Sequence, residues 1–194
     1  MKRIIPVLIV TALAGCKAVT TMNSDGWYHG ENLLTEPPLN SEEYTTHYKE
    51  LPGLKSHLWL KSSDDKESTY VVNIISGKES AKKLRFNVDA PGVNTCETFL
   101  STLITDRDRN GYTSLLWKTD CGLESMSIKS IQLVIVGEDS TYHIRKLWKG
   151  GVSDDAFNDW HEHLDKISLC DTRSSEHVCP AGYNQTNETI NPLN

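Results

Sequence analysis

Four cysteines between positions 96 and 179 constrain the folding of this 194-residue chain more than any other feature. In an oxidising compartment Cys96, Cys121, Cys170 and Cys179 are expected to form two disulfides, each contributing roughly 2–4 kcal/mol. Four cysteines allow three pairings. We favour Cys170 with Cys179, which closes a short loop, and hence Cys96 with Cys121. A zinc site is the competing interpretation, but no two of these cysteines have the close spacing of a zinc knuckle.

The N-terminal segment has the pattern of an export signal. Two cations at positions 2 and 3 precede an apolar run over 4–13, and small residues then lead to Cys16. A helix that spans a bilayer needs roughly 20 apolar residues, so this run is too short to be a transmembrane helix. Export to an oxidising compartment agrees with disulfide formation by the four later cysteines.

The segment Leu13-Ala14-Gly15-Cys16 resembles the lipobox of bacterial lipoproteins. The resemblance implies cleavage before Cys16, acylation of that cysteine and stable anchoring to a bilayer, for which two or more acyl chains are sufficient. In Gram-negative lipoproteins an Asp after the cysteine favours the inner membrane, so Lys17 implies the outer membrane, with the domain facing the periplasm. Loss of residues 1–15 changes the formal charge from -6 to -8, so the lipid alone must provide membrane adhesion.

Composition divides the remaining chain into three parts. Residues 16–53 are polar, contain Pro37-Pro38 and show no sustained apolar period, which predicts a tether. Residues 54–180 are expected to form the folded domain. Residues 181–194 are rich in Asn and are expected to form a disordered tail.

Within the predicted domain, the spacing at which apolar residues recur indicates an α+β fold. Runs with strand character occupy 58–60, 69–75, 84–88, 112–118, 131–136 and 142–148. Turn-forming residues at 137–140 predict that the last two strands form a hairpin.

Helical spacing predicts one helix over 96–104, with Asn94 as N-cap and Glu97 as its capping-box partner, and a second after Ser153. We therefore expect a small antiparallel sheet with both helices on its apolar face. The order of three strands and a helix, occurring twice, suggests an internal repeat.

A weak calcium pattern precedes the fourth predicted strand. Asp106, Asp108, Asn110 and Gly111 match positions 1, 3, 5 and 6 of a calcium loop. Position 12 is Trp117, so the closing carboxylate is missing. A solvated turn explains the same residues, and we predict no cofactor.

The densest titratable cluster, His161, Glu162 and His163, lies on the second predicted helix. Residues two apart on a helix diverge by about 200°, so the two histidines cannot readily chelate one metal ion. His161 falls on the apolar stripe with Trp160 and is expected to be a buried, hydrogen-bonded side chain.

Two aromatic residues in the predicted tether, Trp27 and Tyr28, have no obvious core to enter and are candidates for binding a partner. A tether that folds back onto its own domain is the alternative interpretation. Trp148 and Trp160 are expected to be core residues.

Charge and motifs limit the function. The acidic chain has no basic patch for nucleic acid. No nucleophile elbow, zinc-protease motif or phosphate-binding glycine loop is present. We expect a non-enzymatic, lipid-anchored subunit of an envelope or secretion assembly. The alternatives are a periplasmic immunity protein or inhibitor, and a cell-wall or lipid hydrolase.

Overall fold

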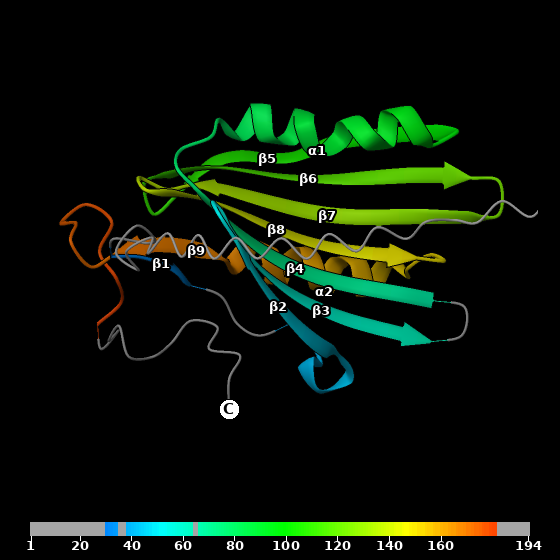
Figure 1. Ribbon diagram of the computed structural model, residues 1–194, viewed down its shortest axis with the longest axis horizontal. Helices are drawn as coiled ribbons and strands as arrows, with labels where there is room; N and C mark the ends of the chain where they lie inside the picture. Colours follow the sequence, from blue (N-terminus) through cyan, green and yellow to red (C-terminus); the bar gives the residue numbers. More distant parts are fainter. Residues whose placement is uncertain (1–29, 35–37, 64–65, 182–194) are drawn as a thin grey trace, which may run out of the picture.

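A seven-stranded antiparallel sheet forms the centre of the protein (Figure 1). The computed structural model describes residues 30–34, 38–63 and 66–181. The strands lie in the order β2-β3-β4-β8-β7-β6-β5. Their bounds are β2 Thr45–Leu51, β3 Leu54–Ser63, β4 Lys66–Ser76, β5 Thr98–Arg109, β6 Tyr112–Leu123, β7 Met126–Val136 and β8 Ser140–Lys149. Strands β2 and β5 are therefore the two edges.

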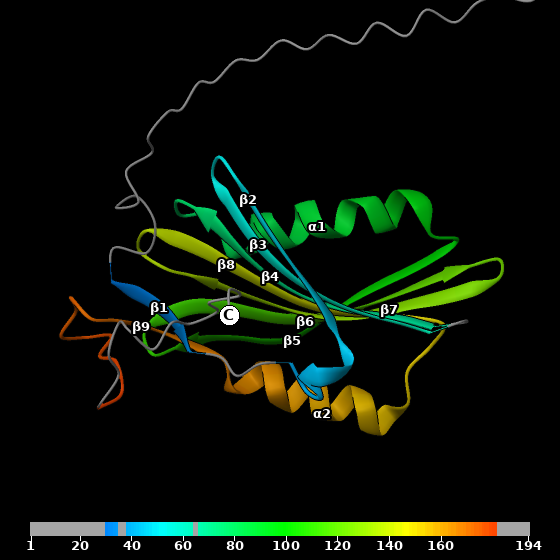
Figure 2. The same cartoon turned by 60° about the horizontal axis from the view of Figure 1, so that its bottom comes forward.

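The two helices cover opposite faces of this sheet, α1 (Ala81–Thr95) on one and α2 (Asp154–Lys166) on the other (Figure 2). Along β7, Leu133 and Ile135 pack in the large core beneath α2, whereas Val134 packs with α1. Because successive strand residues point to opposite faces, a strand covered on both sides is apolar at nearly every position. The expectation that both helices share one face was wrong, and the run 131–136, apolar at every position except Gln132, is consistent with the two-sided cover.

Two predicted elements exchanged their type. The predicted strand 84–88 lies inside α1, and the predicted helix 96–104 falls largely in β5. A spacing of four residues fits both one helical turn and two strand periods, so Leu84 with Val88, and Phe99 with Leu103, are compatible with either structure. Asn94 lies in the last turn of α1 and caps no second helix.

Most other elements are confirmed. The predicted strands 58–60, 69–75, 112–118, 131–136 and 142–148 lie within β3, β4, β6, β7 and β8. The β7–β8 hairpin turns between Val136 and Ser140. Ser153 caps α2, accepting a hydrogen bond from the backbone N–H of Ala156 (3.3 Å). Four strands separate the two helices, so the repeat of three strands and a helix is not confirmed.

The segment predicted to be a tether contributes structure to the fold. Strand β1 (Glu31–Leu34) pairs with β9 (Ser168–Asp171) in a small second sheet, the 3-10 helix η2 spans Ser41–Glu43, and β2 pairs with β3. The folded part therefore begins before residue 54. Every residue of β2 is exposed. Because neither face of this strand is buried, its sequence shows no alternation of apolar and polar residues. Residues 16–29 of the predicted tether, and 182–194 of the predicted tail, lie outside the described residues.

Both favoured disulfides are present. Cys96, just after α1, is bonded to Cys121 of β6, and Cys170 of β9 is bonded to Cys179. The Cα–Cα distances are 5.4 and 4.9 Å. The first disulfide fixes the end of α1 to the sheet, and the second closes the C-terminal loop. Within the described ranges, neither helix is long and apolar enough to cross a membrane.

Candidate functional site

An open groove of about 650 Å³ runs between α1 and the edge strand β5. We call it the α1–β5 groove and define it by Phe86, Ala90 and Val93 of α1 with Phe99 and Leu103 of β5. The lining is mainly apolar. Phe86 is 75% exposed, Val93 is 64% exposed and Leu103 is 43% exposed. Contiguous exposed apolar side chains of this size are typical of an interaction surface.

The way α1 packs explains why this surface is left open. Ala81 and Leu84 are buried against the sheet, in contact with residues of β6 and β7. Phe86 lies two positions after Leu84, about 200° round the helix, so it cannot reach the same core. The side of α1 that faces away from the sheet centre therefore presents its apolar side chains above β5.

Gly92 allows α1 and β5 to approach closely. A Cβ atom at this position would lie 2.3 Å from Cε2 of Phe99, a distance that side chains do not tolerate. Glycine inside a helix costs about 0.5–1 kcal/mol relative to alanine. The benefit is that the Phe99 ring packs against the helix at Gly92 and lines the groove.

A polar network fixes the wall of the groove. Asp89 accepts hydrogen bonds from Nε1 of Trp117 (3.1 Å) and from Oγ of Ser101 (2.6 Å). Arg85 donates to Oγ of Ser101 (2.9 Å), and its Nε lies 3.6 Å from Asp89. Because these bonds join α1 to both β5 and β6, the groove is held in shape without a ligand. The satisfied Asp89 carboxylate is thus a structural group.

Strand β5 also offers backbone groups. It pairs with β6 on one side only, since it is an edge of the sheet. An unpaired edge can accept a further strand through main-chain hydrogen bonds, with specificity coming from neighbouring pockets. The α1–β5 groove lies directly beside such an edge.

The calcium candidates lie at the end of β5 and in the turn of the β5–β6 hairpin. Asp106 and Asp108 are on β5, and Asn110 and Gly111 form the two-residue turn to β6, with φ of 50° and 83°. Positive φ at both positions is the geometry of a type I′ turn, for which Asn-Gly is the preferred pair. The Nδ2 group of Asn110 donates to the carbonyl of Leu169 (2.9 Å). Among the described residues, no group of three or more His, Cys, Asp or Glu is placed to hold a metal ion.

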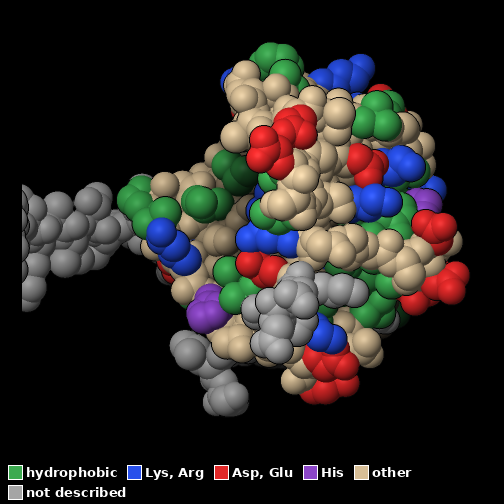
Figure 3. Space-filling model, turned by 90° about the vertical axis from the view of Figure 1, so that its right-hand side faces the viewer, with side chains coloured by type: hydrophobic (Ala, Val, Ile, Leu, Met, Phe, Trp, Pro, Cys, Tyr) green, Lys and Arg blue, Asp and Glu red, His purple; other side chains and the backbone are tan. Residues whose placement is uncertain are grey.

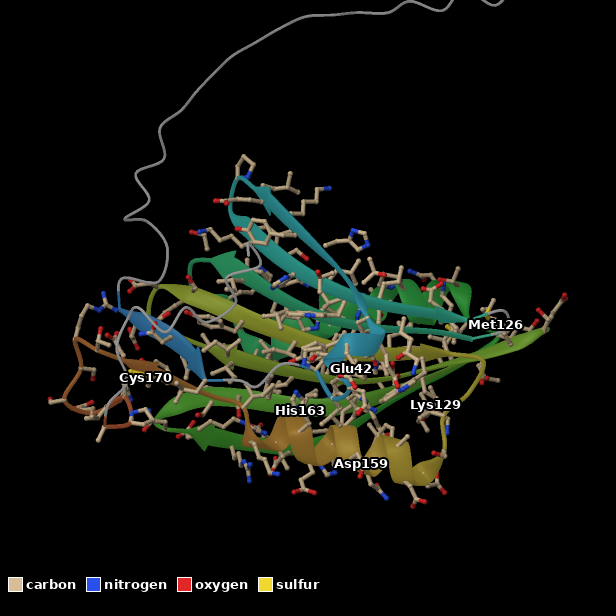
Figure 4. The ribbon with its side chains drawn as sticks, turned by 90° about the horizontal axis from the view of Figure 1, so that it is seen from below. Glu42, Met126, Lys129, Asp159, His163 and Cys170 are labelled. Carbon is tan, nitrogen blue, oxygen red and sulfur yellow. A yellow bond between two sulfur atoms is a disulfide. The ribbon has the colours of Figure 1, made fainter. Side chains whose placement is uncertain are left out.

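The helix cluster is placed differently from the prediction. His163, labelled in Figure 4, is buried in contact with Tyr70 and Trp160, whereas His161 is half-buried. The apolar stripe of α2 passes through position 163 because it includes Trp160 and Leu164. The prediction that His161 is the buried histidine was wrong.

The tryptophans that the structure describes are all core residues. Trp59, Trp117, Trp148 and Trp160 are at most 8% exposed, which confirms the prediction for the last two. The predicted binding pair Trp27 and Tyr28, and the lipidation residue Cys16, lie outside the described residues. The α1–β5 groove was missed because its residues were assigned to the wrong element types.

A fully buried lysine is the most unusual group of the core. Lys146 of β8 donates hydrogen bonds to the hydroxyls of Tyr44 (2.6 Å) and Ser68. Its Nζ lies 4.4 Å from the ring centroid of Trp160. Burial lowers the pKa of Lys146 to about 7. The sequence contained a signal, since Lys146 alternates with the inward-facing Ile144 and Trp148.

A buried carboxylate fastens the N-terminal strand to the main sheet. Glu31 of β1 accepts hydrogen bonds from the backbone N–H groups of Glu138 and Asp139 and from the hydroxyl of Tyr142. Burial raises the pKa of Glu31 above its usual range, although these donors oppose the shift. This side chain links β1 to the β7–β8 turn, in addition to the pairing of β1 with β9.

The surface charge does not form a single-sign patch at the end of the molecule drawn in Figure 3. Lysine and arginine side chains are interspersed with aspartate and glutamate on that face. This mixture agrees with the modest formal charge of -6.

No model of a known protein family matches the chain, and no curated protein matches it significantly in sequence. The class defined by the structure is a disulfide-bonded, antiparallel α+β domain with an apolar groove beside an open strand edge.

Proposed function

We propose that this chain is a lipid-anchored envelope protein of a Gram-negative bacterium that acts by binding another envelope protein. The observation that carries the proposal is the exposure of Phe86, Val93 and Leu103 in the α1–β5 groove. The occupant is an extended segment of the partner, which adds to the β5 edge and inserts apolar side chains beside α1.

The anchor supports this function physically. Acylation at Cys16, implied by the lipobox resemblance, would confine the domain to a membrane surface and raise its effective concentration near a partner in the same membrane. A groove of modest area can then give stable association. An accessory subunit of an envelope or secretion assembly is the role that best fits these properties.

Co-purification with matched variants tests the proposal. The full chain is captured from detergent extracts of its own cell envelope, together with a Phe86→Ser, Val93→Ser double variant and a Met126→Ser control. Met126 is also exposed (44%) but lies at the β6–β7 turn, away from the groove. All three substituted side chains are on the surface, so each change should alter stability by no more than about 0.5 kcal/mol.

We expect one stoichiometric partner with the native chain and with the control, and its loss with the double variant. Retention of the same partner by the double variant would contradict docking in the groove. A dimer of this chain in place of a second protein would contradict the proposed partner class. The activity of the captured protein would show whether this chain is a subunit of an assembly or an inhibitor of the captured protein.

A further inference from the structure

A second surface is formed by β8, the central strand of the sheet, on the side where α1 lies. Helix α1 contacts β5, β6 and β7, so this face of β8 lies beside the helix and not beneath it. Ile144 and Lys146 point to the α2 side, and Arg145 therefore points to the α1 side. Its cross-strand neighbours are Val71 of β4 and Gln132 of β7.

Arg145 has no counter-charge among the residues that the structure describes. Its Nε is buried without a hydrogen-bond partner, and within the described part of the chain no carboxylate lies within ion-pair distance of its guanidinium. Strands β7 and β8 contain no acidic residue. The one acidic residue of β4, Glu67, is paired with Lys149 (2.7 Å). Burial lowers the pKa of Arg145.

The polar groups next to Arg145 are neutral and occupied with one another. Nε2 of His143 lies 3.0 Å from Oε1 of Gln132, whose Nε2 donates to Ser130 (3.0 Å). Ser130 shares a hydrogen bond with Thr119 (2.7 Å). Burial, with Arg145 nearby, lowers the pKa of His143 to about 3, so this histidine is uncharged at neutral pH.

An arginine that is partly removed from water loses solvation, and an anion is the group that restores it best. The residue is half-buried, so part of its side chain remains accessible from outside. We propose that Arg145 is the centre of a binding site for an anionic group, a carboxylate or a phosphate. These neutral neighbours leave the positive charge of the guanidinium uncompensated.

The site is separate from the α1–β5 groove, so its test is independent of the proposed function. The full chain, labelled with ¹⁵N-arginine in detergent micelles, is titrated with sodium phosphate and separately with sodium acetate at constant ionic strength. Arg107, which is exposed on the other face and paired with Asp165 (2.8 Å), is the internal control. We expect the Nε–Hε resonance of Arg145 to shift in a saturable manner, while that of Arg107 does not.

Thermal unfolding of variants gives a second measurement. Phosphate or acetate should raise the melting temperature of the native chain and of Arg107→Gln. Arg145→Gln and Arg145→Lys should bind at least tenfold more weakly, as expected when charge-assisted bidentate hydrogen bonds are lost. The lysine variant keeps the charge and serves if the glutamine variant folds poorly.

A response to one anion alone identifies the ligand as a carboxylate or as a phosphate. The proposal is overturned if neither anion shifts the Arg145 resonance saturably. It is also overturned if Arg145→Gln responds to the anions as the native chain does, because Arg145 would then only cover apolar surface with its stem.

Discussion

Replacement of Lys146 by Met should change how the stability of the protein depends on pH. The unfolded chain holds this ammonium with a pKa near 10.5, whereas the folded chain holds it with a pKa of about 7. Between these values the unfolded state binds more protons, so the free energy of unfolding rises with pH. The native chain should therefore gain about 2–3 kcal/mol between pH 6 and pH 9 relative to Lys146→Met.

The contacts of Lys146 support the sign of this effect. Its hydrogen bonds go to the hydroxyls of Tyr44 and Ser68, which are neutral, and not to a carboxylate. Cation–π contact with Trp160 favours the charged form, so the observed gain should fall toward the lower end of the range. Methionine has a similar length and can fill the same space without a charge.

Urea unfolding followed by tryptophan fluorescence at pH 6, 7, 8 and 9 measures the difference. Lys83→Met, an exposed position on α1, is the control and should give a profile parallel to the native one. Parallel profiles for the native chain and Lys146→Met would refute the reasoning. A native chain that loses stability with rising pH relative to Lys146→Met would refute it equally.

Three further outcomes are expected. Cys16→Ala should block acylation and leave unprocessed precursor, detected by palmitate labelling and mass; a variant that is still cleaved and fully membrane-associated would contradict the lipobox interpretation. Glu31→Ala should lower the free energy of unfolding by about 2–4 kcal/mol, because three donors lose their acceptor. Urea unfolding measures this free energy, and a smaller loss would contradict the prediction. Cys170→Ser with Cys179→Ser should cost roughly 2–3 kcal/mol for a short loop, and an unchanged melting curve would exclude this contribution.

The sequence correctly predicted those elements in which the spacing of apolar residues fits only a helix or only a strand. The β7–β8 hairpin follows from two apolar runs and a turn, and α2 follows from a long stripe with a good N-cap. The segment 81–109 was misassigned, because a four-residue spacing suits both a helix and a strand. The second sheet pairs β1 with β9, which lies more than 130 residues further along the chain, and a local sequence pattern cannot reveal such a long-range pairing.

The candidate sites were harder to predict for the same reason. The α1–β5 groove exists only because α1 is a helix and β5 is an edge strand, and both were assigned the opposite type. Arg145 and Lys146 are adjacent in the sequence but lie on opposite faces of β8. Whether a charge is paired depends on neighbouring strands, and the strand order was not available from the sequence.

Site-specific photo-crosslinking in living cells tests the central claim most directly. A benzophenone amino acid is placed at position 86 in the α1–β5 groove and, in a separate strain, at position 126 on the β6–β7 turn. The account predicts a discrete crosslink to one other envelope protein from position 86, and none to that protein from position 126. Crosslinks to that protein from both positions, or a crosslink from 126 alone, would contradict docking through the groove.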